Sequence, residues 1–299
     1  MSIKSLEQLV DLALKKELKK MVVAVAEDED VLIAVRNAHK AGFIDPLLIG
    51  NKDRIKIAAE AAEFDISAIE IVHEVSPVKA CSMASGIIAE GKASILMKGL
   101  VSTGILMKAF LDKELGLAQG KFLSHVALFE SPYYHKVICI TDAALNISPD
   151  IEEKTAIVKN AVNMYHALGI KIPKVGILAA VETVNPKMEA TVHAAMLKVM
   201  NQRNQLNGCI IDGPLALDNA ISKEAANHKG ILSDVAGDVD ILLTPEINCG
   251  NILYKAINFL GGAITAAIIT GAAVPVVLTS RADSEKSKYL SIALAAALN

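Results

Sequence analysis

The 299-residue sequence contains no tryptophan, and aromatic residues make up only 4% of it. It has four cysteines, which lie far apart: Cys81, Cys139, Cys209 and Cys249. This spacing excludes the paired pattern of a zinc site and the dense framework of a small disulfide-bonded domain. We therefore expect free cysteines and a protein of a reducing compartment, the cytoplasm.

The sequence also lacks an excess of charge of one sign. Its 30 basic and 33 acidic residues give a net charge of −3, and like charges form no block. A nucleic-acid-binding surface would need a basic stripe, so this class is excluded. Arginine is scarce, with only four positions: Arg36, Arg54, Arg203 and Arg281. Any functional cations must be placed individually.

Long hydrophobic runs are interrupted. Charges divide residues 1–20, which predicts an amphipathic surface helix and argues against a signal peptide. The weakly charged stretch 259–279 contains three glycines and Pro275, which divide it into helix, turn and strand. We therefore expect no membrane span.

Short aliphatic runs are abundant, and 53% of the residues are hydrophobic. The runs predict buried strands at 21–26, 45–50, 66–72, 93–97, 137–141, 174–179, 208–211, 239–243 and 274–278. Helical patterns such as 28–41 and 151–168 separate them. This alternation predicts an α/β fold with mostly parallel sheets, in which ligands collect at the carboxyl ends of strands.

The first polar junction is KGLVSTG (98–104), which directly follows the strand at 93–97. Ser102 and Thr103 can cap the next helix, and its free backbone N–H groups together with Lys98 can hold a phosphate. The glycine spacing is not that of a Walker loop. An ordinary capped helix with a surface lysine would show the same pattern.

The second junction is TSRADSEKS (279–287), which follows the strand at 274–278. Ser280 and Arg281 are candidate phosphate contacts, because a guanidinium offers paired donors that an ammonium lacks. Asp283 could contribute chemistry or simply begin the next helix.

Two further junctions carry candidate polar contacts. Asn248 and Asn251 lie in PEINCGN, and Asp218 lies in DGPLALDNA. Each could contact a substrate, and each fits equally a helix cap or an ordinary turn. Cys249 lies at an expected helix start, where a thiolate would be favoured.

Six segments in one order, including KGLVST, SHVALFE, TDAALNISPD and SRADSE, resemble the phosphate acetyltransferase and phosphate butyryltransferase family. The resemblance runs from about residue 22 to the C-terminus, and the SRADS form is closer to the butyryl branch. It implies two α/β lobes of the isocitrate/isopropylmalate dehydrogenase type with a cleft between them. The expected lobes are residues 1–130 with 272–299, and residues 131–271.

The resemblance also implies reversible transfer of a short acyl group between coenzyme A and inorganic phosphate, by direct attack and without a metal or other cofactor. The family's phosphate-binding Ser-Arg pair corresponds to Ser280 and Arg281, and an arginine of the acetyl enzymes is replaced by Lys108. The aspartate that activates the thiol of coenzyme A is replaced by Ser287, which leaves the nearby carboxylates Asp283 and Glu285 as candidate bases. Both could instead be charges at the start of the helix, and this structural role is favoured for Glu285. The family further suggests a homo-oligomer.

Three other interpretations stay open at this point. The acyl group could be acetyl. The fold could instead carry an NAD-dependent hydroxyacid dehydrogenase, although that enzyme needs several substrate arginines and a cluster of aspartates. The junctions could also belong to a non-catalytic sensor of acyl-CoA, which would bind the ester without releasing coenzyme A.

Overall fold

The computed structural model describes residues 2–118, 121–279 and 283–298. The chain forms two compact units: unit 1 contains Met1–Leu6 and Phe122–Thr265, and unit 2 contains Glu7–Lys121 and Ala266–Asn299. The division expected from the sequence placed a boundary between residues 130 and 131. That point lies in the turn between two antiparallel strands, which the contacts keep together within unit 1.

Unit 2 alternates strands and helices. Its elements are α1 (Glu7–Ala13), β1 (Lys19–Ala24), α2 (Glu29–Ala41), β2 (Ile44–Gly50), α3 (Lys52–Ala61), β3 (Glu70–His73), α4 (Pro77–Ala89), β4 (Ile95–Lys98), α5 (Thr103–Phe110), the 3-10 turn Lys113–Leu115, β10 (Ile264–Thr270), β11 (Val276–Val277) and α11 (Glu285–Leu298). The strand order is β3-β2-β1-β4-β11-β10. All neighbours are parallel except β10 and β11.

Unit 1 repeats this pattern. It contains β5 (Ser124–Glu130), β6 (Ile138–Thr141), α6 (Ile151–Ala167), β7 (Lys174–Leu178), α7 (Glu189–Gln202), β8 (Ile210–Leu215), α8 (Leu217–Ile221), α9 (Lys223–His228), β9 (Ile241–Leu243), α10 (Ile247–Lys255) and the π-helical turn Ala256–Leu260. The strand order is β5-β6-β9-β7-β8. Only the β5–β6 pair is antiparallel.

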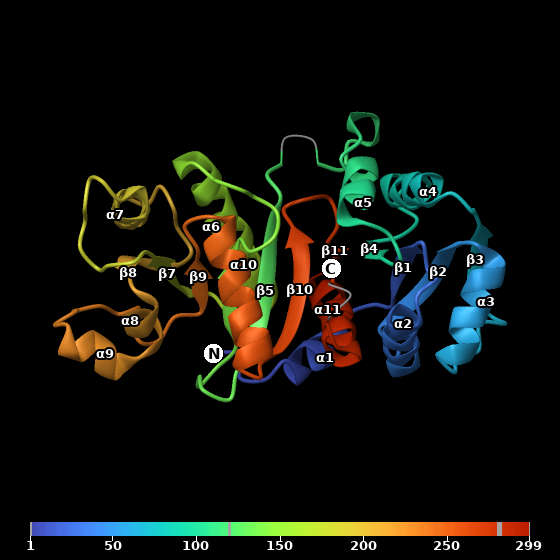
Figure 1. The fold of residues 1–299 in the computed structure, drawn as a ribbon, viewed down its shortest axis with the longest axis horizontal. Helices are drawn as coiled ribbons and strands as arrows, with labels where there is room; N and C mark the ends of the chain where they lie inside the picture. Colours follow the sequence, from blue (N-terminus) through green and yellow to red (C-terminus); the bar gives the residue numbers. More distant parts are fainter. Residues whose placement is uncertain (1, 119–120, 280–282, 299) are drawn as a thin grey trace. The chain divides into compact units, whose positions relative to one another are not determined.

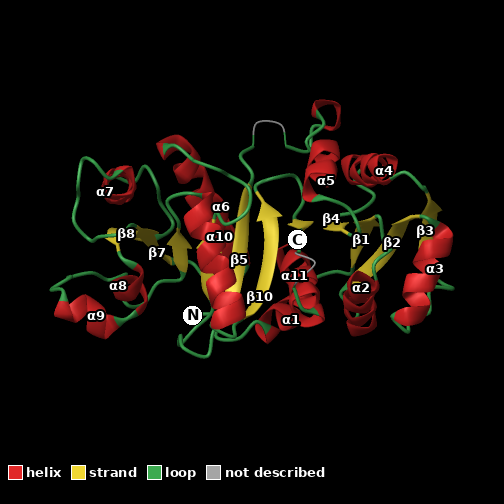
Figure 2. Ribbon diagram, viewed as in Figure 1, coloured by secondary structure: helices red, strands yellow, loops and turns green. Residues whose placement is uncertain are grey.

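Helices cover both faces of the strands within each unit (Figures 1 and 2). In unit 2, α2 and α3 lie on one face of β1 and β2, and α4 lies on the other. In unit 1, α7 lies on the face of β7 and β8 opposite to α8 and α9. Because both faces are covered, central strands such as β1 are buried from Met21 to Ala24. This burial explains their continuous aliphatic sequences.

Most strands predicted from the aliphatic runs are present within a few residues of the predicted bounds, which confirms the α/β fold with mostly parallel strands. Two strands were missed, β5 and β10, and each pairs antiparallel with a neighbour. The stretch 259–279, expected to contain helix, turn and strand, begins at the end of the π-helical turn. It then forms a strand already at Ile264–Thr270, where β-branched residues dominate.

The prediction of a helix over residues 1–20 was too long. Only Glu7–Ala13 is helical, and Lys19 and Lys20 already belong to β1. Leu6 and Leu9 are almost fully buried, so this helix is anchored by its leucines. Among the described residues, no helix has the length and apolar character needed to cross a membrane.

Candidate active site

Unit 2 brings two of the predicted junctions to one edge of its sheet. Strands β4 and β11 are parallel neighbours, with Val277 opposite Met97. The two strands therefore end at the same edge, with Gly99 and Leu278 directly after them, although these positions lie about 180 residues apart in the chain. Ser280 and Arg281 lie outside the described residues. Thr279 and Asp283, which flank them, are buried.

The turn after β4 is held tightly against the end of β1. The backbone N–H of Gly99 donates to Ala24 O at 2.9 Å, and that of Leu100 donates to Val25 O at 2.7 Å. A side chain at position 99 would overlap the Val25 carbonyl, so only glycine fits. The buried Lys98 donates from Nζ to Gly99 O (3.2 Å) and Val101 O (3.3 Å). Lys98 therefore shapes the turn that presents α5.

The N-terminus of α5 is open to solvent. Ser102 caps it by accepting a hydrogen bond from the Ile105 N–H at 3.3 Å. Ser102, Thr103 and Gly104 are all exposed. The unpaired N–H groups and the positive end of the helix dipole favour an anion there. Lys108 is also exposed but lies in the last turn of α5, about 7.5 Å along the helix axis from Thr103.

Lys288 is a residue of this edge that sequence reasoning missed. It is buried on α11, and its Nζ donates to the Asp283 carbonyl at 2.6 Å and lies 3.4 Å from Asp30 Oδ2. It thus fixes the backbone on the C-terminal side of Arg281. One feature of the sequence could have indicated its burial: Lys288 lies one turn after Ser284, in a helix whose following residues are mostly apolar. The buried Ser287 lies 3.1 Å from Ser284 Oγ, in the first turn of α11.

Unit 1 joins two other polar segments at the carboxyl ends of β6 and β9. The Thr244 N–H donates to Thr141 O at 2.8 Å. The Asp142 carboxylate accepts the backbone N–H groups of Ala144 and Leu145, each at 2.9 Å. A side chain at Gly250 would overlap the Asp142 carbonyl and lie 2.8 Å from Thr244 Oγ1. Glycine therefore lets α10 pack directly against this loop.

The two candidate asparagines lie on α10. The exposed Asn248 donates from Nδ2 to Glu246 Oε2 at 2.7 Å. The partly buried Asn251 donates to the Ala143 carbonyl at 3.2 Å. Both amide groups therefore support the local structure through their N–H side, while each Oδ1 keeps its capacity to accept a hydrogen bond.

Asp218 lies in the first turn of α8 and is exposed. Its carboxylate lies 3.1 Å from Lys229 Nζ, and the hydrogen bond from Lys229 lowers the pKa of Asp218. The next residue, Asn219, is fully buried, and its amide has no hydrogen-bond partner among the described residues. No local pattern distinguishes Asn219 as the buried member of this pair.

Cys249 differs from the sequence-based expectation of a stabilised thiolate. Partial burial, followed by the charge of Glu246, raises the pKa of the Cys249 thiol. Glu246 caps α10 by accepting the N–H groups of Asn248 (2.8 Å) and Cys249 (2.7 Å). Its carboxylate thereby offsets the helix-end field that would otherwise stabilise a thiolate. Cys81, Cys139 and Cys209 are buried, as expected, and burial raises the pKa of each.

We accordingly expect Cys249→Ala to retain most of the activity, since a thiol with a raised pKa is a poor nucleophile. Steady-state kinetics of the purified variant measure this. Mass spectrometry of the parent protein after incubation with acyl-CoA alone provides the second readout. A folded but inactive variant, together with an acyl group on Cys249 in the parent, would show a covalent route in place of direct attack.

Among the residues that the structure describes, no group of three or more His, Cys, Asp or Glu side chains could hold a metal ion.

Comparisons with known proteins identify the family. The family described as "Phosphate acetyl/butaryl transferase" matches residues 5–79 and 69–296. A phosphate butyryltransferase of Clostridium acetobutylicum is 47% identical over 98% of both chains. A phosphate acetyltransferase of Thermotoga maritima is 44% identical over 97% of this chain and 98% of its own.

A solved structure supports the same family. A branched-chain phosphotransacylase from Enterococcus faecalis V583 superposes with a TM-score of 0.84 and 33% identity, covering 94% of this chain and 98% of its own. The two strand-end junctions of unit 2 and those of unit 1 therefore lie on a fold shared along nearly the whole chain. The chain belongs to the phosphate acetyl/butyryl transferase family.

Proposed function

We propose that this protein transfers a short acyl group, butyryl or one of similar size, reversibly between coenzyme A and inorganic phosphate. The reaction is acyl-CoA + phosphate ⇌ acyl phosphate + coenzyme A. Family membership supports the reaction class. The observation that supports the proposal is the register of β4 and β11, because the strands that precede the sequences KGLVST and SRADS end at one edge of the sheet.

The chemistry needs a site that holds phosphate and stabilises an oxyanion. We assign phosphate to Ser280, Arg281 and the N-terminus of α5 with Ser102 and Thr103, while Lys98 shapes the turn and Lys108 adds charge. Attack of phosphate on the thioester carbonyl forms a tetrahedral oxyanion, and expulsion of the coenzyme A thiolate gives the acyl phosphate. N–H and hydroxyl donors lower the barrier of this step, each by about 2.7–4 kcal/mol.

In the reverse direction the coenzyme A thiol must lose a proton. We propose Asp283 as the base, because it is a buried residue two positions after Arg281 in the sequence, and Lys288 holds its backbone carbonyl. Ser287, at the family's aspartate position, has a hydroxyl and cannot act as a base near neutral pH. Asn248, Asn251 and Asp218 are proposed substrate contacts in unit 1.

A coenzyme A release assay tests the proposal. We expect release to depend on phosphate, to persist with excess chelator, and to be fastest with butyryl-CoA in a series from acetyl-CoA to hexanoyl-CoA. Two buried methylenes, at about 0.8 kcal/mol each, predict a roughly 15-fold preference for butyryl over acetyl. Highest efficiency with acetyl-CoA would move the protein to the acetyl branch. Binding of acyl-CoA without phosphate-dependent release would make it a sensor.

We further propose that the enzyme works in the cytoplasm as an assembly of identical chains. Free cysteines and substrates built on coenzyme A support the location. Exposed apolar side chains on α10 and the turn after it support the assembly: Ile252, Phe259 and Leu260 are 68%, 61% and 88% exposed. Light scattering of the purified protein should give a mass at least twice that of the chain.

A further inference from the structure

Unit 1 contains a cavity of about 640 Å³ away from the proposed substrate contacts. It lies at the amino ends of strands: Lys136 precedes β6, Lys174 begins β7, and Asp240 precedes β9. These strands are parallel, so Asn248 and Asn251, which follow the carboxyl end of β9, lie beyond the opposite edge of the sheet. The cavity is therefore separate from the residues that the proposed function uses in this unit.

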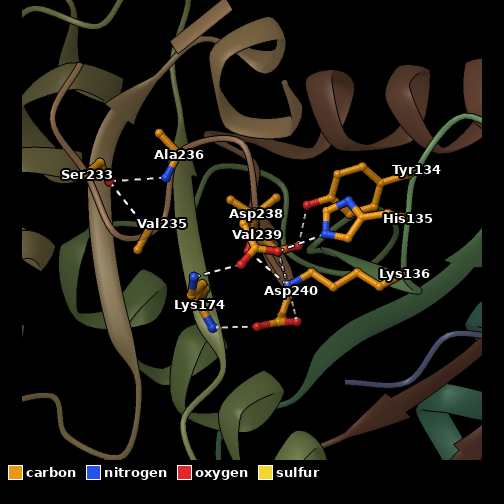
Figure 3. Close-up of polar contacts among 10 residues, drawn as sticks. All are labelled: Tyr134, His135, Lys136, Lys174, Ser233, Val235, Ala236, Asp238, Val239 and Asp240. Carbon is orange, nitrogen blue, oxygen red and sulfur yellow. Dashed lines mark hydrogen bonds and ion pairs between the residues drawn. The ribbon is translucent and has the colours of Figure 1, made fainter. Parts of the chain in front are cut away.

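Five of the residues that line the cavity form an ion-pair cluster, whose contacts Figure 3 shows: His135, Lys136, Lys174, Asp238 and Asp240. Lys136 is 6% exposed, and its Nζ lies 3.0 Å from Asp238 Oδ1 and 2.7 Å from Asp240 Oδ1. Asp238 also contacts Lys174 Nζ at 2.7 Å and His135 Nε2 at 2.8 Å. The Lys174 N–H donates to Asp240 Oδ2 at 2.8 Å. Each oxygen of the two carboxylates therefore contacts at least one donor of the cluster.

The cluster has more cations than anions. Burial alone would raise the pKa of Asp238, but hydrogen bonds from Lys174, Lys136 and His135 hold it well below its usual range, so the carboxylate stays charged. Lys171, in the loop between α6 and β7, also lines the cavity, and within the described residues it forms no ion pair. Three lysines against two aspartates leave a positive charge even with His135 neutral, in a chain whose net charge is −3.

The cavity also has an apolar wall. Ile170 and Ile172 line it, and Ile172 is 61% exposed. Sites for small organic ligands have volumes of about 300–1,000 Å³ and combine apolar walls with a few charged groups. A bare inorganic ion would leave most of this space and the isoleucines uncovered.

We propose that this cavity binds a small organic anion, one phosphate or carboxylate group joined to a compact apolar portion. Lys171 supplies the primary cation. Lys174 and His135, which share Asp238 with the buried Lys136, supply further donors to the anion, and Ile170 and Ile172 cover the apolar portion. Lys136 stays paired with Asp238 and Asp240 and holds these two carboxylates in position.

Phenyl phosphate and benzoate are suitable probes, with benzyl alcohol as the neutral analogue, and isothermal titration calorimetry measures binding. We expect saturable binding of at least one anion and at least tenfold weaker binding of benzyl alcohol. Lys171→Met should weaken anion binding about tenfold or more, as expected for the loss of one charge-assisted contact. Binding of both anions indicates that charge is recognised, and binding of one identifies the preferred group.

Lys187→Met is the matched control, because Lys187 is an exposed lysine of the same unit and does not line the cavity. It should bind the probes like the parent. Arg281→Lys separates this cavity from the proposed active site and should also leave probe binding unchanged. The proposal is overturned if neither anion binds, if Lys171→Met binds like the parent, or if Arg281→Lys alone abolishes binding. None of these readouts depends on acyl transfer, so the proposed function stands or fails separately.

Discussion

Arg281→Lys is expected to lower kcat/KM for phosphate about 100-fold while the protein remains folded. Of the four arginines, only Arg281 follows a predicted strand end. Lysine keeps the positive charge but loses the two parallel N–H donors that match a phosphate. A 100-fold loss corresponds to about 2.7 kcal/mol of transition-state stabilisation, the range found for one well-placed donor. Initial rates over a phosphate series, with circular dichroism as a check of folding, measure the effect.

Arg203→Lys is the control for this change. Arg203 is an exposed residue that caps the C-terminus of α7, so the same exchange there should leave kcat/KM within about twofold. Lys108, which the proposed site also uses, is itself a lysine, so it cannot supply the paired donors lost from Arg281. Unchanged phosphate kinetics in folded Arg281→Lys would remove Arg281 from the proposed phosphate site.

Gly99→Ala is expected to reduce both stability and activity. The new methyl group would overlap the Val25 carbonyl, which also accepts the Leu100 N–H, and a backbone atom cannot move aside as a flexible side chain can. Overpacking of this kind costs about 1–3 kcal/mol. The turn that carries Ser102 and Thr103 must shift, and a displacement of about 1 Å can lower a rate by about 100-fold. Thermal unfolding and phosphate-dependent coenzyme A release measure the two effects.

Gly104→Ala provides a matched control five residues later. Its added methyl group meets no atom within 4 Å, and the position lies inside α5. Alanine should there stabilise the helix by about 0.5–1 kcal/mol, and because the backbone N–H that the proposed phosphate site uses is kept, the rate should fall far less than in Gly99→Ala. If Gly99→Ala behaves like Gly104→Ala in both measurements, close packing against Val25 is not what positions the turn.

The aliphatic runs by themselves determined the α/β class and most of the strands. Parallel strands covered on both faces must be apolar at nearly every position, and that requirement is visible in segments such as 21–26 and 93–97. The cap of α5 was also visible, because Ser102 accepts the N–H group of Ile105, only three residues away. Strand β10 was not recognised, although β-branched residues dominate Ile264–Thr270 and its antiparallel partner β11 begins only six residues later.

Only the tertiary structure decided which junctions meet. The register of Val277 with Met97 brings the ends of β4 and β11 to one edge of the sheet, and no local pattern records a pairing across about 180 residues. The same holds for Lys288 beside Asp30, 258 residues away in the chain, and for the cavity cluster, whose Lys136, Lys174 and Asp238 come from three separate loops and strands. Local sequence carries the preferences of each backbone segment and its nearest neighbours. Contacts between distant segments, and the charge environments they create, arise only when the strands pair and the helices pack on them.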